Sequence, residues 1–355
     1  MNITHFPIHV VLPEAVDDPA RPSGGNVYDR RVCDELVDAG WILEEHLVSG
    51  DWPHPTPADQ ADLARLLSHL PNQATVLIDG LIGSAASALT AESDRLRQVL
   101  LMHMPLAETV PEVRVRATER SALRSARAVV TTSHWARRWV LSHHGLEPDS
   151  VHVAEPGTDL RAPATGSASS GELLCVASVT ADKGHDTLVE ALAQVQDLPW
   201  HCTCVGSLTL EPGFVDRLRT TTERRGIADR VSFLGPLSDP ALQIVRSRTD
   251  LVVSASHRES FGMAVTEGLA CGIPVVATSV GGHPEAVGRT EGGATPGLLV
   301  PVRDADSLSA ALRRWLTDAA LRESLRQVAQ RRRSDLMPWA ETAKKISEVL
   351  SAVRR

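Results

Sequence analysis

The residues best suited to chemistry in this chain are two glutamates that follow a buried apolar segment. Glu259 lies in the loop after a predicted strand at 251–255, and Glu267 lies eight positions later, with Gly262 placed to begin a helix between them. Carboxylates accept hydrogen bonds from hydroxyl groups, so one glutamate could bind sugar hydroxyls and the other ribose hydroxyls. The N-terminus of the intervening helix would offer free N–H groups and a favourable dipole to a diphosphate.

Two further loops are candidates for binding phosphate. Gly24 and Gly25 precede a helical pattern, and paired glycines let the backbone approach a phosphate closely, although a flexible turn is the alternative explanation. Lys183 follows a predicted strand, lies just before a glycine and is the only lysine before Lys344 in a chain rich in arginine. Its compact charge suits phosphate, so we favour that role over an ordinary solvated surface lysine.

The elements that must position these residues are predicted by the hydrophobic pattern. Short apolar, β-branched segments alternate with longer amphipathic ones, which is typical of parallel sheets covered by helices. The expected strands are residues 9–12, 42–48, 75–81, 99–104, 128–132 and 151–154, and then 173–179, 201–206, 231–234, 251–255, 275–277 and 298–300. In such sheets ligands bind beyond the carboxyl ends of the strands, where the candidate loops are expected.

The 355 residues suit two domains. Residues 161–171 read RAPATGSASSG, a small and polar composition that predicts an exposed connection. We therefore expect an N-terminal α/β domain at 1–160, a linker at 161–171 and a C-terminal α/β domain at 172–336. A final amphipathic helix within 337–355 has no strand after it and is expected to pack back on the first domain.

The composition excludes several classes of function. A net charge of -8 argues against nucleic-acid binding, and no segment approaches the ~20 apolar residues of a membrane span, so we expect a cytoplasmic protein. The five cysteines form neither a disulfide framework nor a zinc motif, and Cys202 and Cys204 are expected to share one buried strand face.

Two charged segments invite a functional interpretation that we set aside. Asp304-Ala-Asp306 resembles a metal motif but precedes a helical segment, so it predicts a helix cap and first-turn acid. Arginines at 114–127 could contact anionic lipid, but the interleaved Glu112 and Glu119 favour a solvated helix face over membrane contact.

In the context of these glutamates the chain resembles the family 4 retaining glycosyltransferases of the GT-B fold. Their signature is two glutamates with seven residues between them, here Glu259 and Glu267, in a Glu-Ser-Phe-Gly context that ends Gly-x-Pro-Val-Val-Ala. Other family landmarks follow in order over most of the chain: Gly24-Gly25, His103, Thr132-Ser133, Pro156-Gly157, Lys183-Gly184, Phe233-Leu-Gly235, Gly281-Gly282 and Pro284-Glu285. The resemblance implies two Rossmann-like doubly wound domains that face each other across a cleft, with the acceptor on the first and the donor on the second.

The resemblance also implies roles for individual residues. Glu259 would contact donor-sugar hydroxyls, Glu267 the ribose, Lys183 the diphosphate charge, and His103, at the end of a strand, the donor sugar. The other implied donor contacts are Gly24 and Gly25 at the β-phosphate, Leu237 at the base, and Ser178, Ser260, Phe261, Gly262 and Met263. Asp79 and Asn26 are expected on the acceptor side.

One position departs from the family pattern. Many members carry an arginine five residues before the lysine, where this chain has Ser178. The diphosphate charge would then depend more on Lys183, or another arginine such as Arg258 would replace the missing one.

The implied activity is transfer of a hexose-type sugar from a nucleotide-diphosphate sugar, with a UDP-sugar favoured, to a small-molecule or glycan acceptor. No metal and no resident cofactor are expected, and retention of configuration would follow from same-face attack. A nucleotide-sugar epimerase or phosphorylase on the same fold is the main alternative, and a sensor that binds without turnover is another. A nicotinamide oxidoreductase is disfavoured because Gly-x-Gly-x-x-Gly follows neither first strand. The sequence does not indicate the oligomeric state.

Overall fold

The computed structural model describes residues 6–20, 22–110 and 112–355, and it divides into two compact α/β units. The first unit contains the N-terminal segment through Asp18 and residues 24–157 and 338–355, and the second contains 19–23 and 158–337. Within the second unit, the Thr158 N–H donates to the Met337 carbonyl at 2.8 Å, which joins the two ends of that unit.

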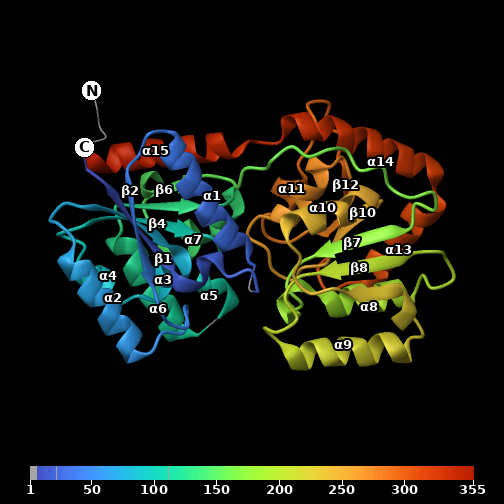
Figure 1. Cartoon of the computed structure of the whole chain (residues 1–355), viewed down its shortest axis with the longest axis horizontal. Coiled ribbons are helices and arrows are strands. Elements are labelled where there is room, and N and C mark those ends of the chain that lie inside the picture. The colour runs from blue at the N-terminus through green and yellow to red at the C-terminus, as the bar shows by residue number, and fades with distance from the viewer. Residues whose placement is uncertain (1–5, 21, 111) are drawn as a thin grey trace. The chain divides into compact units, whose positions relative to one another are not determined.

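The first unit is built on a parallel sheet with the order β2-β1-β3-β4-β5-β6 (Figure 1). Its strands are β1 (Ile8–Pro13), β2 (Leu43–Val48), β3 (Thr75–Asp79), β4 (Arg97–Met102), β5 (Ala128–Thr131) and β6 (Val151–Val153). Its α-helices are α1 (Gly24–Asp38), α2 (Pro57–His69), α3 (Gly80–Ala85), α4 (Ala88–Ala91), α5 (Leu106–Thr109), α6 (Val113–Ser125), α7 (His134–His144) and α15 (Trp339–Arg354).

Both faces of this sheet are covered, so its central strands are almost wholly apolar. Val11, Ile78 and Leu100 pack with residues of α2, α3 and α6 on one face. On the other face α15 contacts β3, β4 and β5 and packs beside α1, as Figure 1 shows. The indole N–H of Trp41 donates to the Ser347 hydroxyl at 2.9 Å, and this bond holds α15 on the unit.

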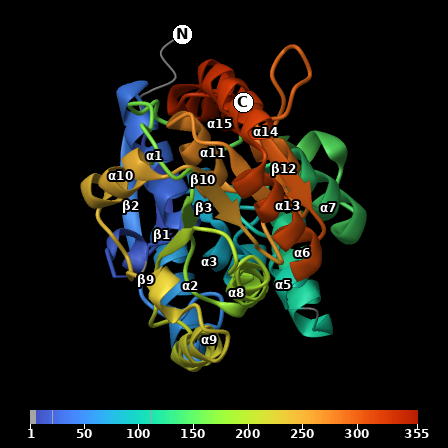
Figure 2. The same cartoon turned by 90° about the vertical axis from the view of Figure 1, so that its right-hand side faces the viewer.

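The second unit repeats the plan with the order β12-β11-β10-β7-β8-β9. Its strands are β7 (Glu172–Val176), β8 (His201–Val205), β9 (Val231–Phe233), β10 (Leu251–Ser254), β11 (Val275–Thr278) and β12 (Gly297–Val300). Its α-helices are α8 (His185–Ala193), α9 (Pro212–Arg224), α10 (Asp239–Arg248), α11 (Met263–Ala270), α12 (His283–Val287), α13 (Ala305–Thr317) and α14 (Ala319–Arg332). α8 and α9 lie on one side of the sheet and α11 and α14 on the other (Figure 1 and Figure 2).

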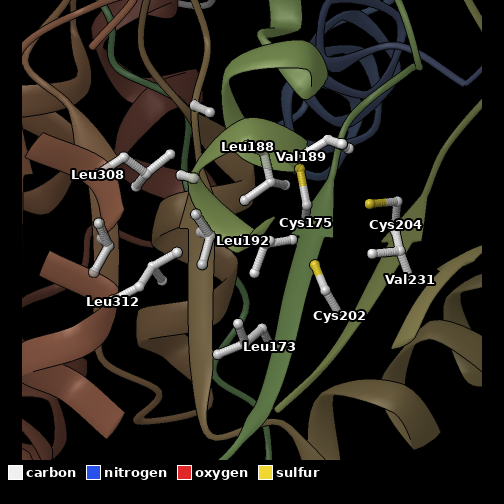
Figure 3. Packing of buried hydrophobic residues seen from close by; sticks show 14 of the residues in the cluster. Leu173, Cys175, Leu188, Val189, Leu192, Cys202, Cys204, Val231, Leu308 and Leu312 are labelled. Atoms are coloured by element: carbon white, nitrogen blue, oxygen red, sulfur yellow. The ribbon is translucent and has the colours of Figure 1, made fainter. Parts of the chain in front are cut away.

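One hydrophobic cluster of the second unit contains three of the cysteines. Cys175, Cys202 and Cys204 lie on β7 and β8 among leucines of α8 and α13 (Figure 3). Cys202 and Cys204 are both buried, as their spacing on one strand predicted, and all five cysteines are free thiols. They act as small apolar core residues.

Each of the twelve expected strands has a counterpart in the structure, with ends that differ by a few residues. The expectation for Asp304 is confirmed: its carboxylate accepts the Ser307 N–H at 2.8 Å and caps α13, with Asp306 in the first turn. Among the described residues, no helix combines the length and the apolar character that crossing a membrane requires.

The expected linker runs along the second unit. The Ala164 N–H donates to the Cys271 carbonyl at 2.8 Å, and the Ser167 N–H donates to the Asp250 carboxylate at 2.9 Å. Asp250 is buried and also accepts the N–H of Glu172. Because a buried carboxylate must find donors, it fixes this polar segment in place.

The assignment of Glu119 to a solvated face of α6 is wrong. Its carboxylate is fully buried and accepts the N–H groups of Leu106 and Ala107 at 2.6 and 3.0 Å. It also lies 3.0 Å from His144 Nε2, whose side chain is equally buried. These partners satisfy the carboxylate inside the unit, while the neighbouring arginines of α6 stay exposed.

Candidate functional site

Lys183 and Glu259 lie together in the second unit, on loops that follow the adjacent strands β7 and β10. Lys183 Nζ is 3.0 Å from Glu259 Oε2, with the side chains 25% and 18% exposed. Burial disfavours the charge of Glu259, but Lys183 and His283 outweigh burial and lower the pKa of that carboxyl. Burial also opposes the charge of Lys183, yet Glu259 raises its pKa. Both groups are therefore charged at neutral pH, and they remain accessible to a ligand.

Two contacts hold these loops against each other. The His257 N–H donates to the Asp182 carbonyl at 2.7 Å, one residue from Lys183. Gly184, at φ 67°, lets α8 begin so close to β10 that a Cβ there would lie 2.0 Å from the Ala255 carbonyl oxygen. The position of Lys183 is thus set by backbone contacts as well as by its ion pair.

The loop of Glu259 also packs on the loop after β11. The Gly282 N–H donates to the Glu259 carbonyl at 2.9 Å, and the Thr278 hydroxyl donates to the Ser256 carbonyl at 2.6 Å. Gly262 adopts φ 110° and begins α11, as the sequence predicted. The first turn of α11 therefore starts four residues after Glu259, and the N–H groups at a helix N-terminus are the kind that bind anions.

We predict that Gly281→Ala will distort this loop. A Cβ at Gly281 would lie 1.7 Å from the Glu259 carbonyl oxygen, and the residue has φ 56°. We expect the free energy of unfolding to fall by about 3 kcal/mol, measured by urea denaturation. Gly293→Ala is the matched control because it shares a positive φ of 79° but meets no atom within 4 Å. Equal effects of the two variants would contradict the proposed close approach.

Glu267 projects from α11 and is held by an arginine that the sequence analysis missed. Its carboxylate forms an ion pair with Arg246 of α10, whose side chain is 4% exposed, while Glu267 itself is 34% exposed. Burial raises the pKa of Glu267, and Arg246 opposes that shift. Arg246 also lies 3.9 Å from Asp239. The glutamate is thus oriented by a buried partner and still reaches the surface.

The other predicted donor residues lie in loops of the same unit. The Ser178 carbonyl accepts the Thr180 N–H at 2.9 Å, and the flanking Ala177 and Val179 bond to β8 and to the loop that follows it. Ser260 and Met263 are partly buried and Phe261 is buried beside Gly262. Leu237 is partly buried and follows Gly235, which has φ 72°. Their predicted roles toward a donor stay predictions.

In the first unit, Gly24, Gly25 and Asn26 form the first turn of α1. Gly25 lies against His103, because a Cβ there would be 3.2 Å from His103 Cδ2. The Asn26 side-chain amide donates to the Ala15 carbonyl at 3.2 Å, so it helps to hold the preceding loop. The structure thus brings the glycine pair and the predicted histidine together.

His103 is held by two buried carboxylates. Its Nε2 lies 2.8 Å from Asp29 Oδ1 and 3.2 Å from Asp79 Oδ2, and it follows the carboxyl end of β4. Burial disfavours a charged imidazole, but the two carboxylates outweigh it and raise the pKa of His103 to about 10. At neutral pH His103 is therefore an imidazolium, which can donate hydrogen bonds but cannot act as a general base.

Asp79, which is expected on the acceptor side, is almost fully buried. Its side chain is 2% exposed, and its Oδ1 accepts the N–H groups of Leu81 and Ile82 at 2.8 and 3.2 Å and caps α3. Asp29, which the sequence analysis missed, is fully buried. Burial raises the pKa of Asp29 to about 7, against the influence of His103. The triad of Asp29, Asp79 and His103 is thus a compact proton-holding cluster.

The side chains around His103 are of the types that could bind a metal ion. Asp29, Asp79 and His103 bring ligand atoms within 4.8 Å of one another. A proton on His103 Nε2, which lies 2.8 Å from Asp29 and 3.2 Å from Asp79, would compete with a cation for this position.

Two family models match consecutive parts of the chain. The description "Glycosyl transferases group 1" matches residues 164–332, and "Glycosyltransferase Family 4" matches residues 18–162. The first match covers Lys183, Glu259 and Glu267, and the second covers Gly24, Gly25 and His103. Together the two matches follow the division into two units.

Curated relatives share about a third of the matched residues. The D-inositol 3-phosphate glycosyltransferase of Jonesia denitrificans is 33% identical over 264 residues, which are 69% of this chain and 61% of that protein. The protein of the same name from Kineococcus radiotolerans is 33% identical over 257 residues, 65% of this chain and 58% of that protein. The matched part thus spans about three fifths of these relatives' length.

Solved structures share the fold over nearly the whole chain. Sucrose-phosphate synthase from Thermosynechococcus elongatus has a TM-score of 0.80 at 21% identity, with 98% of each chain covered. Anabaena HepE in complex with UDP and glucose has a TM-score of 0.75 at 19% identity, with 98% of this chain and 100% of that chain covered. At these identities the similarity is evidence for the fold alone.

Proposed function

The chain belongs to the family 4 glycosyltransferases of the GT-B fold, and we propose that it transfers a hexose-type sugar from a nucleotide-diphosphate sugar to a small-molecule or glycan acceptor. The observation that carries this proposal is the ion pair between Lys183 and Glu259, next to the N-terminus of α11. The ion pair and the N-terminus of α11 together bring a cation, a carboxylate and N–H groups into one unit. These are the groups that a sugar diphosphate requires.

Each member of this set would meet a different part of the donor. Lys183 would neutralise the charge that develops on the departing diphosphate, and the N-terminus of α11 would add N–H donors. Glu259 would accept hydroxyls of the sugar, which a carboxylate with a lowered pKa does well because it stays ionised. Glu267, oriented by Arg246, would accept the two ribose hydroxyls.

We further propose that the reaction retains configuration and needs no metal ion. Lys183 and the helix N-terminus supply positive charge for the leaving group. Because His103 is an imidazolium, it would donate a hydrogen bond, and the leaving phosphate is left as the base that deprotonates the acceptor. Retention by same-face attack agrees with this division of roles.

The donor and acceptor assignments are supported unequally. HepE structures are described with UDP and with UDP-glucose, which favours a uridine nucleotide for this chain as well. The names of the curated relatives make an inositol phosphate one acceptor to test. The first unit would supply the acceptor residues, and we assign none of them beyond the positioning roles of Asp79 and Asn26.

A thermal-shift panel of uridine, guanosine, adenosine and thymidine diphosphates and their sugars tests the donor assignment. Binding to the folded state raises the unfolding temperature by mass action, and we expect the uridine compounds to give the largest shift. Glu267→Ala should abolish that shift because the ribose loses its acceptor. The exposed Glu223 of α9 provides the control, since Glu223→Ala should respond like the original protein. An unchanged shift in Glu267→Ala would exclude the ribose assignment.

Incubation with donor alone separates the transferase from its alternatives. An epimerase would convert the sugar without an acceptor, and a phosphorylase would require phosphate. A sensor would bind the donor without turnover under every condition. We expect slow or no consumption of donor until an acceptor is added, followed through release of the nucleoside diphosphate.

A further inference from the structure

Three potential ligand residues share one face of the first sheet at its β2 edge. His9 of β1 pairs with Glu44 of β2, and Val11 pairs with His46, in parallel register. Side chains two residues apart on a strand point to the same face, so Glu44 and His46 lie together, with His9 across from them. The backbone register alone therefore places two imidazoles and a carboxylate side by side.

The side-chain atoms also approach one another at short range. His9 Nδ1 lies 3.1 Å from His46 Nε2 and 3.4 Å from Glu44 Oε2, and all three ligand atoms lie within 4.8 Å of one another. Ligands bound tetrahedrally to zinc at about 2.0–2.1 Å are roughly 3.3 Å apart. The two distances from His9 bracket that value, and the third pair of ligand atoms lies within 4.8 Å.

We infer that His9, Glu44 and His46 form a binding site for a divalent transition-metal cation of the zinc class. Two imidazoles and one carboxylate are a donor set that zinc accepts, with a fourth position left for water. Magnesium prefers oxygen ligands and binds such a set weakly. The inference does not depend on the proposed transferase activity.

One of the three ligands is buried, and the other two are partly or largely exposed. The His9 side chain is 6% exposed, whereas that of Glu44 is 56% exposed. The carboxylate side of the cluster is open, which gives a cation a path in.

The strongest alternative is a hydrogen bond between the two rings. With one ring nitrogen protonated, the 3.1 Å separation of His9 and His46 fits an N–H···N bond. That bond does not involve Glu44, whereas a cation would use all three groups. The experiment must therefore detect the cation itself.

A bound cation would join the edge strand β2 to its neighbour β1. His9 is the second residue of β1, four residues before the carboxyl end of the strand and so roughly 13 Å from that edge. The transfer chemistry is assigned to the carboxyl ends, so the cation would stabilise the sheet without taking part in transfer. Loading should raise the unfolding temperature and leave turnover unchanged.

Titration of tag-free, chelator-treated protein with zinc chloride by calorimetry tests the inference. We expect one high-affinity site, no comparable heat with magnesium chloride, and X-ray absorption showing two imidazole ligands. His46→Ala and Glu44→Gln change partly or largely exposed side chains and should fold, and His46→Ala should weaken binding by about tenfold or more. His69→Ala, an exposed histidine at the end of α2, should bind zinc like the original protein.

Two results would overturn the inference. Zinc affinity that is unchanged in His46→Ala would mean that any binding occurs elsewhere on the surface. Affinity that is lost in Asp29→Asn but kept in His46→Ala would place the cation at the other cluster, with His103. The zinc affinities of these variants test the cation site even if the proposed sugar transfer is wrong, because they do not depend on turnover.

Discussion

Lys183→Met is expected to lower kcat/KM for the nucleotide-sugar donor by about 10²- to 10³-fold, the range found when one preorganised charge donor is removed from a transition state. Lys183 is the cation that contacts Glu259, at 3.0 Å, and its charge has no replacement at Ser178. The loss should fall mainly on kcat, because charge on the diphosphate grows as the sugar bond breaks. Steady-state kinetics with saturating acceptor measure it.

Lys345 offers a matched control for Lys183. It is also a lysine in an ion pair, with Glu155, but it belongs to α15 of the first unit. Lys345→Met should leave kcat/KM within about twofold, because surface ion pairs contribute little to stability and no role in transfer is assigned to Lys345 or Glu155. A comparable loss in both variants would point to general destabilisation instead of lost catalysis.

The pairing with Glu259 makes a further comparison possible. In Lys183→Met the carboxylate of Glu259 keeps its burial but loses its cation, so its pKa should rise. Adding Glu259→Gln to the same chain should therefore cost less than it does alone. Additive losses from the two substitutions would argue that the residues act independently, and nearly full activity of Lys183→Met would remove Lys183 from the mechanism.

The candidate residues of the second unit could be located from the sequence because their signals are local. Glu259, Gly262 and Glu267 lie within nine residues, and a strand, a loop and one helix fix their relative positions. The strands could be predicted for a similar reason, since a strand buried on both faces is a short continuous apolar segment. Local composition was enough in both cases.

The buried ionic partners could not be predicted because their signal is tertiary. Asp29 and Arg246 lie on amphipathic helices, where a charged residue ordinarily faces solvent. Only the packing shows that Asp29 faces His103, seventy-four positions away, and that Arg246 faces Glu267. The burial of Glu119 could not be predicted for the same reason, because its partners Leu106, Ala107 and His144 are not its neighbours in the sequence.

Composition also does not show that residues 161–171 pack along the second unit. Small and polar residues at 161–171 fit an exposed connection, but they also fit a segment whose N–H groups satisfy a buried acid. Asp250 at the edge of β10 supplies that acid and draws Ser167 to it. Composition gives no information about an acceptor that lies eighty residues further along the chain.

The second large effect is expected at Asp29. In the original protein His103 should remain an imidazolium up to about pH 10, and the ¹⁵N and ¹³C resonances of its ring report this directly by NMR. Asp29→Asn removes one of the two carboxylates that raise the pKa of His103, so the titration should move to lower pH. If His103 must donate a hydrogen bond to the ligand, kcat at pH 8 should fall by about 10-fold or more in this variant.

The raised pKa of His103 also determines how the stability of the folded state changes with pH. The pKa of His103 is raised from 6.5 to about 10 on folding, so its proton stabilises the folded state fully below pH 6.5 and ceases to do so as pH rises through about 10. The difference in unfolding free energy between the original protein and His103→Gln should therefore be largest in mild acid and shrink toward pH 10. A difference that grew with pH would contradict the assignment.

Asp34→Asn is the control for Asp29→Asn, because Asp34 lies on the same helix with an exposed side chain. It should leave the His103 titration, the pH dependence of unfolding and kcat unchanged. A histidine that titrates near 6.5 in the original protein would remove the imidazolium from the mechanism and return His103 to the candidates for a base. A retained imidazolium together with full activity in Asp29→Asn would show that Asp79 alone is enough to hold the proton, and that Asp29 contributes to packing only.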